Sequence, residues 1–168
     1  MKFVVTAGPT REYLDPVRFL SNPSTGKMGF AVARVAAMRG HEVVLVAGPV
    51  SLKTPKGVRR IDVTSARDML AAVEEEMAKA KSGKPTIFVA TAAVADWRPA
   101  KCAPRKLKKG QMSDTLKLVR NPDILKEIGR RTKTAQSPTR PLILWASPPR
   151  QTTSSRKRGA SAARRTST

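Results

Sequence analysis

The fold is decided by residues 2–47, which have the sequence KFVVTAGPTREYLDPVRFLSNPSTGKMGFAVARVAAMRGHEVVLVA. Two short apolar runs rich in β-branched residues, at 2–7 and 43–50, are typical of buried strands. Between them, apolar residues recur near helical spacing from Lys27, and Gly40 marks the end of that helix. The order of strand, helix and strand predicts a right-handed parallel crossover within one sheet.

The same alternation continues along the chain. Further strands are predicted at 58–63, 85–92, 116–119 and 141–144, and further helices at 65–80, with Ser65 as N-cap, and after residue 123. The stretches 9–23 and 94–110 lack periodicity, so the first is predicted to be irregular and the second to be a long functional loop. The pattern predicts an α/β fold with a doubly wound, mostly parallel sheet of Rossmann-like topology.

Charge divides the chain into two parts. The 168 residues carry a formal net charge of +21, yet all 12 acidic residues lie at or before Glu127. The last 40 residues hold ten basic residues and no acidic one. We therefore expect a nucleotide-binding domain at 1–144 and a disordered basic tail, rich in Ser, Pro and Arg, at 145–168.

Cysteine usage and hydropathy bear on the compartment. Cys102 is the single cysteine, so no intrachain disulfide can form, and a lone thiol suits a reducing cytosol. No apolar run reaches the roughly 18 residues of a membrane span, and the N-terminus lacks a signal-peptide pattern. These features predict a soluble cytoplasmic protein.

Two stretches are suited to binding a phosphate. Gly8 follows the first predicted strand, where a small residue lets an anion approach the backbone. Ser24, Thr25 and Gly26 precede the first helix, whose free N–H groups and dipole favour anions. The glycine spacing is not that of a Walker loop, and a G-x-G-x-x-G pattern is missing, which argues against a dinucleotide oxidoreductase.

Five further motifs occur in a fixed order. They are LDPVRFLSNPSTGKMGFAVA at 14–33, GPVSL at 48–52, AAVADWRP at 92–99, KLKK at 106–109 and NPDIL at 121–125. Together they resemble the phosphopantothenate–cysteine ligase family over roughly residues 2–144. In many bacteria this domain is fused behind a flavin-dependent decarboxylase that this sequence lacks, so the resemblance implies a separate decarboxylase partner.

The resemblance implies a two-step ligation of 4′-phosphopantothenate to L-cysteine. CTP converts the carboxylate to an acyl-cytidylate with loss of pyrophosphate, and the cysteine amine then displaces CMP. Mg²⁺ would bridge the triphosphate with few protein ligands, and none is assigned. The family also implies a homodimer, with the KLKK segment near the partner.

Residue roles are carried over from the family motifs. Asn22 would donate a hydrogen bond to the acyl intermediate, Arg18 would hold a phosphate or carboxylate, and the flap lysine Lys106 would close over the acyl-cytidylate. Contacts to the nucleotide are expected from Gly8, Ser24, Thr25, Gly26, Ala92, Asp96, Asn121, Pro122, Asp123 and Ile124.

Simpler interpretations stay open beside these roles. Asn22 before Pro23 is also ordinary turn chemistry, and Arg18 and Lys106 could be solvated surface charges. A rival function is a basic nucleic-acid-binding protein, which the pI of 11.4 favours. Nucleic acid is nevertheless the less favoured partner, because no aromatic residue follows Trp145 to stack on bases.

The sequence leaves the family pattern after Leu144. The family continues with VGFAAET, whereas this chain continues with WASPPRQTT. Degenerate codons for the residues after Trp145, read two nucleotides out of phase, permit Gly-Phe-Ala-Ala-Glu-Thr. We therefore predict that the tail is out-of-frame sequence and that the ligase domain is incomplete. Such a domain can lose its activity and its preference for CTP over ATP.

Overall fold

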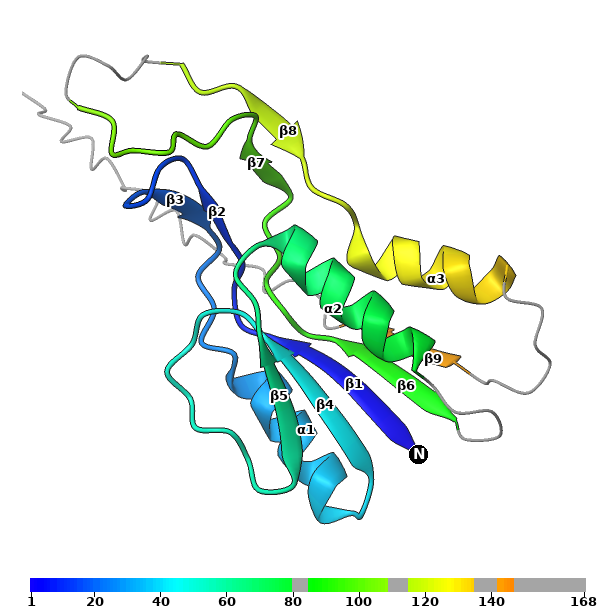
Figure 1. The fold of residues 1–168 in the computed structure, drawn as a ribbon. Coiled ribbons are helices and arrows are strands. Elements are labelled where there is room, and N and C mark those ends of the chain that lie inside the picture. Colours follow the sequence, from blue (N-terminus) through cyan, green and yellow to red (C-terminus); the bar gives the residue numbers. More distant parts are fainter. Residues whose placement is uncertain (80–84, 109–114, 135–141, 147–168) are drawn as a thin grey trace, which may run out of the picture.

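The computed structural model describes residues 1–79, 85–108, 115–134 and 142–146. Five parallel strands form its central sheet in the order β5-β4-β1-β6-β9 (Figure 1). The strands are β1 (Lys2–Ala7), β4 (Glu42–Ala47), β5 (Val58–Asp62), β6 (Thr86–Ala90) and β9 (Leu142–Ala146). This order has the first strand at its centre, as in a doubly wound sheet, so the predicted fold class is confirmed.

Helices cover both faces of the sheet (Figure 1). α1 (Lys27–Met38) lies on one face, while α2 (Ala66–Ala78) and α3 (Ile124–Thr134) lie on the other. Successive side chains of a strand point to opposite faces, so Val5 packs with the α1 side and Val4 with the α2 and α3 side. The sheet therefore separates two apolar cores.

The helix ends follow the local chemistry of the sequence. Ser65 Oγ accepts the Asp68 N–H at 3.2 Å, and the Asp68 carboxylate accepts the Ser65 N–H at 2.9 Å. This capping box satisfies two N–H groups at the start of α2 and confirms Ser65 as the N-cap. After α1, Gly40 has a φ of 76°, a left-handed conformation that glycine adopts at little cost.

A hairpin occupies the stretch that was predicted to be irregular, so that prediction was wrong. β2 (Arg11–Tyr13) pairs antiparallel with β3 (Phe19–Ser21). Each strand has three residues, which is too short for an alternating pattern to stand out. The hairpin extends from the carboxyl end of β1 and lies beside β7 (Figure 1), which spans Trp97–Pro99.

The second predicted loop also contains a strand. β7 pairs antiparallel with β8 (Leu118–Arg120), so residues 100–117 connect two strands of a second hairpin. β9 ends at Ala146, two residues into the segment expected to be tail. Residues 147–168 lie outside the described residues, and so does the predicted disorder there. In the described part of the chain, every helix is too short or too polar to span a membrane.

Candidate functional site

The connections that follow β1 and β6 run to opposite faces of the sheet. The chain leaves β1 toward α1 on one face, and it leaves β6 toward α3 on the other (Figure 1). Beyond the two strands the backbones stay in register, because the Ala93 N–H donates to the Gly8 carbonyl at 2.9 Å. In doubly wound folds, ligands bind outside the carboxyl ends of the strands at such a switch point.

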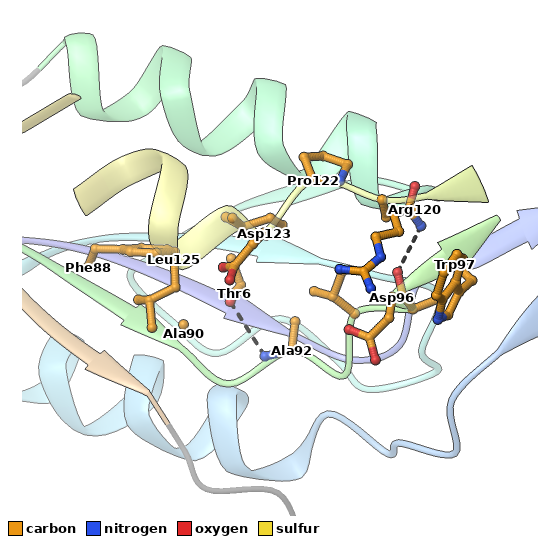
Figure 2. Close-up of a pocket in the computed structure, with 14 residues that line it drawn as sticks. Thr6, Phe88, Ala90, Ala92, Asp96, Trp97, Arg120, Pro122, Asp123 and Leu125 are labelled. Carbon is orange, nitrogen blue, oxygen red and sulfur yellow. Dashed lines mark hydrogen bonds between the residues drawn. The ribbon is translucent and has the colours of Figure 1, made fainter. Parts of the chain in front are cut away.

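A pocket of about 750 Å³ opens at this position (Figure 2). Its volume lies within the range of small-molecule sites. It lies between the carboxyl ends of β1 and β6, the segment after β6, and the segment that leads into α3. The residues that line it are Thr6, Phe88, Ala90, Ala92, Val94, Ala95, Asp96, Trp97, Arg120, Asn121, Pro122, Asp123, Ile124 and Leu125.

Six residues expected to contact a nucleotide meet in this pocket. They are Ala92, Asp96, Asn121, Pro122, Asp123 and Ile124. In the sequence they come from two separate motifs, and the structure brings these motifs together as opposite walls. Sequence reasoning missed Thr6, Trp97 and Arg120, which line the same pocket. For the last two, the available signal was their place beside the motifs: Trp97 lies within AAVADWRP, and Arg120 directly precedes NPDIL.

Asn121 joins the two walls. Its Nδ2 donates to the Ala95 carbonyl at 2.8 Å, and its backbone N–H donates to the Asp96 carbonyl at 2.8 Å. Arg98 Nη1 donates to Asn121 Oδ1 at 3.0 Å. The Asn121 side chain therefore fixes the geometry of the pocket, whatever it contributes to a ligand.

The pocket combines an apolar floor with a charged rim. Phe88 and Ala90 form part of the floor, while Asp96 and Asp123 supply carboxylates from opposite walls (Figure 2). The Arg120 guanidinium lies 5.1 Å from the centroid of the Trp97 ring, a cation–π arrangement at the β7–β8 end. Such a mixture suits a ligand that has a flat apolar part and polar substituents.

The glycine cradle, Gly8 with Ser24 to Gly26, lies on the α1 side of β1. A Cβ on Gly26 would come within 3.2 Å of the Gly8 nitrogen, so the two backbones touch at a place with no room for a side chain. Gly26 is the N-cap of α1 and has a φ of 72°. The Ser24 hydroxyl accepts the Gly26 N–H at 3.3 Å.

The first turn of α1 offers backbone donors, of which the Lys27 N–H bonds to Thr25 Oγ1 at 3.5 Å. The Phe30 N–H bonds back to the Gly26 carbonyl at 3.1 Å. The N–H groups that precede it in the helix therefore have no partner in the helical ladder, and they point from the N-terminus with the positive end of the dipole. The exposed Thr25 stands at this entrance. The geometry is suited to a phosphate group.

Asn22 lies at the rim of the pocket. It follows β3, and its Nδ2 donates to the carbonyl of Val94, a pocket residue, at 2.9 Å. The side chain is exposed to solvent. The hairpin thus carries Asn22 to the segment after β6, so the turn chemistry considered for Asn22 does not describe its contacts fully.

Arg18 contacts the segment that contains Lys106 and Leu107, although Leu107 lies 89 residues later in the chain. Arg18 Nη2 donates to the Leu107 carbonyl at 2.8 Å and to Asp15 Oδ2 at 2.5 Å. Lys106, next to Leu107, is exposed. Arg18 is therefore engaged by the protein itself, in contrast to the solvated charge considered as its alternative.

Asp15 holds this junction and was not identified from the sequence. It is fully buried, and its carboxylate also accepts the N–H groups of Val17 at 2.9 Å and Leu107 at 3.2 Å. The hydrogen bond from the Arg18 side chain, helped by these backbone donors, outweighs burial and holds the pKa of Asp15 well below its usual range. The carboxylate is therefore ionised at neutral pH.

The described residues offer few side chains that could bind a metal ion. Within the described ranges, the structure has no cluster of three or more His, Cys, Asp or Glu side chains that could hold a metal ion. Asp96 and Asp123 are the carboxylates at the pocket. Two such groups suit a magnesium ion that is coordinated mainly by phosphate oxygens and water.

Residues 1–144 match a protein family described as the DNA/pantothenate metabolism flavoprotein C-terminal domain. The chain belongs to this family. The resemblance inferred from the five motifs is thereby confirmed.

Curated relatives share about half of the aligned residues with this chain. The coenzyme A biosynthesis bifunctional protein CoaBC of Vibrio cholerae is 50% identical over 134 residues, which cover 79% of this chain and 32% of the relative. CoaBC of Escherichia coli K12 is 52% identical over 128 residues, 74% of this chain and 30% of the relative. The chain thus spans about a third of the length of these relatives.

Two solved structures are similar to this chain. The crystal structure of the C-terminal domain of CoaBC matches with a TM-score of 0.66 at 40% identity, covering 84% of this chain and 61% of that one. A Cab2 mutant in complex with phosphopantothenate-cysteine matches with a TM-score of 0.67 at 16% identity. The second likeness concerns the fold alone.

Proposed function

We propose that this chain is a phosphopantothenate–cysteine ligase domain, which joins 4′-phosphopantothenate to L-cysteine through an acyl-cytidylate made from CTP. One observation carries the proposal: the two predicted nucleotide-contacting motifs at 92–96 and 121–124 form opposite walls of a single pocket at the sheet's switch point. The glycine cradle lies next to it, linked by the hydrogen bond between Ala93 and Gly8.

The arrangement suggests where each part of the nucleotide binds. The pocket between Asp96 and Asp123 would hold the nucleoside, and the glycine cradle with the N–H groups of α1 would hold phosphate oxygens. Magnesium, when bound, would neutralise triphosphate charge and favour departure of pyrophosphate. The protein's contribution is to orient the α-phosphate toward the attacking carboxylate.

The hairpin β2–β3 and the Lys106 segment would act on the acyl group. In the first half-reaction a carboxylate oxygen of phosphopantothenate bonds to the α-phosphorus of CTP and pyrophosphate leaves. In the second, the cysteine nitrogen bonds to the acyl carbon, CMP leaves and the amine loses a proton. Asn22 would donate to the acyl oxygen, and Lys106, with Arg18 near it, would stabilise phosphate charge.

Several wider expectations belong to the same proposal. Relatives are named bifunctional and the chain spans about a third of them, so we propose that a flavin-dependent decarboxylase acts alongside it. A homodimer and a cytoplasmic location stay predictions. So does the out-of-frame origin of the tail, which the nucleotide sequence would contradict if neither shifted frame encodes GFAAET near codon 145. If that origin is correct, CTP and ATP will be poorly discriminated.

Pyrophosphate release tests the function directly. The full chain is mixed with CTP, phosphopantothenate and Mg²⁺, with and without cysteine, and ATP replaces CTP in a parallel arm. Release without cysteine is expected from the first half-reaction, and Asn22→Ala should slow product formation by about 100-fold. Thr54→Ala, at an exposed position outside the pocket and outside the five motifs, is the matched control.

Two results would count against the proposal. One is a lack of pyrophosphate release together with no CTP-induced rise in Tm. The other is salt-dependent binding to random DNA that survives removal of residues 147–168, which would support the nucleic-acid-binding function instead.

A further inference from the structure

The carboxylate of Asp15 connects two segments that are distant in the sequence. It lies in the turn between β2 and β3, and Leu107, whose N–H it accepts, lies 92 residues away. A second bond runs in parallel, from the Ala103 N–H to the Leu14 carbonyl at 2.8 Å. Residues 103–107, which include Lys106, are thus held to the hairpin turn.

The turn is shaped to present this carboxylate. Asp followed by Pro favours a turn, and Asp15 Oδ1 accepts the N–H groups of Val17 at 2.9 Å and Arg18 at 2.8 Å. The Leu14 N–H closes the base of the turn on the Arg18 carbonyl at 2.8 Å. Oδ2 is left to face Arg18 Nε at 3.0 Å and the Leu107 N–H. Oδ1 therefore stabilises the turn, whereas Oδ2 binds the Arg18 side chain and the Leu107 N–H.

Charge makes the connection to Leu107 strong. Asp15 is fully buried, whereas the Arg18 side chain is 36% exposed. A buried anion needs its donors, and hydrogen bonds to a charged acceptor are about twice as strong as neutral ones. Arg18 holds the other polar group of the same residue, because its Nη2 donates to the Leu107 carbonyl. Both polar groups of residue 107 are thereby fixed by one ion pair.

We propose that Asp15 is a positioning residue, which sets the place of Lys106 by fixing the backbone of residues 103–107 against Arg18. The inference rests on the proposed function for the role of Lys106. Asp15 does not touch the substrate in this account. It acts through the peptide that follows Lys106 and through the orientation of the Arg18 guanidinium.

Amide hydrogen exchange of the full chain tests the physical link. In Asp15→Asn the loss of charge should speed exchange of the Leu107 N–H by about tenfold or more, with Ala103 following. Glu76→Gln is the matched control, because Glu76 is another buried carboxylate with several basic partners but lies on α2, away from this segment. It should lower stability without changing the local opening of Leu107.

Kinetics test the positioning role. Asp15→Asn should lower kcat for pyrophosphate release about tenfold while leaving KM for CTP near the wild-type value, because the pocket walls belong to other segments. In a Lys106→Ala background the same substitution should have a clearly smaller further effect, because only its influence on Arg18 remains. A merely structural role would lower activity equally in both backgrounds, and that result would overturn the proposal.

The two levels of inference can fail separately. If the wild-type chain releases no pyrophosphate and CTP does not raise its Tm, the proposed function fails. Unchanged Leu107 exchange in folded Asp15→Asn would still overturn the link on its own. If Asp15→Asn does not fold, Leu107→Pro removes the N–H while leaving the buried ion pair in place. It should speed exchange of Ala103, and unaltered Ala103 protection would overturn the proposal.

Discussion

The central sheet and the two hairpins beside it are stabilised by different interactions. The sheet consists of strands with five or six residues, and the side chains of β1, β4 and β6 contribute to two apolar cores. The hairpins have strands of three residues, and they combine ring contacts, such as that of Tyr13 with Phe19, with polar contacts. Among the polar groups named above, the buried carboxylate of Asp15 has the most partners. Stability and positioning of the site are therefore separable properties in this fold.

The largest expected effect on stability comes from the sheet. Leu45 of β4 is fully buried in the core on the α1 side. Leu45→Ala should lower the free energy of unfolding by about 3 kcal/mol through lost contacts and a cavity. Urea unfolding measures this loss. CTP affinity per folded molecule should stay unchanged, and a parallel fall in affinity would contradict the separation of sheet and site.

A smaller effect on stability, with a larger one on binding, is expected at the cradle. Gly26→Ala places a Cβ 3.2 Å from the Gly8 nitrogen at a φ of 72°. The strain should cost about 1–2 kcal/mol of stability. Calorimetry should find CTP binding weakened by more than Leu45→Ala weakens it. Equal affinities in the two variants would mean that phosphate binds elsewhere.

The N-cap of α2 offers a still smaller change within the scaffold. Ser65→Ala removes the hydroxyl that accepts the Asp68 N–H and should lower the free energy of unfolding by about 1 kcal/mol. Thermal unfolding followed by circular dichroism measures it. Ser65→Asp, which keeps an acceptor at the N-cap, should retain most of the stability. A similar loss in both variants would argue against the capping box.

The smallest expected effect is on how the free energy of unfolding changes with pH. Burial acts to raise the pKa of Glu76, but hydrogen bonds from Lys2, Lys79 and Arg59 outweigh it, so the net shift is downward. A lowered folded-state pKa gives stability that is present above the unfolded pKa of about 4.3 and is lost as the pH falls below it. Urea midpoints should therefore fall less steeply below pH 4 in Glu76→Gln than in the wild type. Identical slopes would contradict the lowered pKa.

Most of the sheet could be predicted because its signals are local. Apolar runs, the capping Ser65 and the terminal Gly40 each act within a few residues of the element they define. The same holds for the two motifs at 92–99 and 121–125, whose roles came from the family resemblance and whose meeting in one pocket follows from the parallel strand order. Long elements with a regular apolar pattern can therefore be predicted from their own residues.

The rest could not be predicted because its causes are distant. In the sequence, Asp15 has the context of an ordinary turn residue. Its role depends on the N–H of Leu107, which lies 92 positions later in the chain. Asn121 was expected at the nucleotide, yet its amide bonds to the Ala95 carbonyl and to Arg98, which no spacing in the sequence announces. Strands of three residues, such as β2 and β7, carry too few side chains to show alternation.

The strand order also has a consequence for how the chain assembles. Apart from the β2–β3 hairpin, β1, α1, β4 and β5 follow one another in the chain and are neighbours in space. β6, in contrast, pairs with β9 across the intervening residues 91–141. That stretch contains β7, β8 and α3, and with them one wall of the pocket. Closure entropy rises slowly, by about 0.6 kcal/mol for each doubling of loop length. Insertions between β7 and β8 should therefore alter the site greatly while scarcely affecting whether the protein folds.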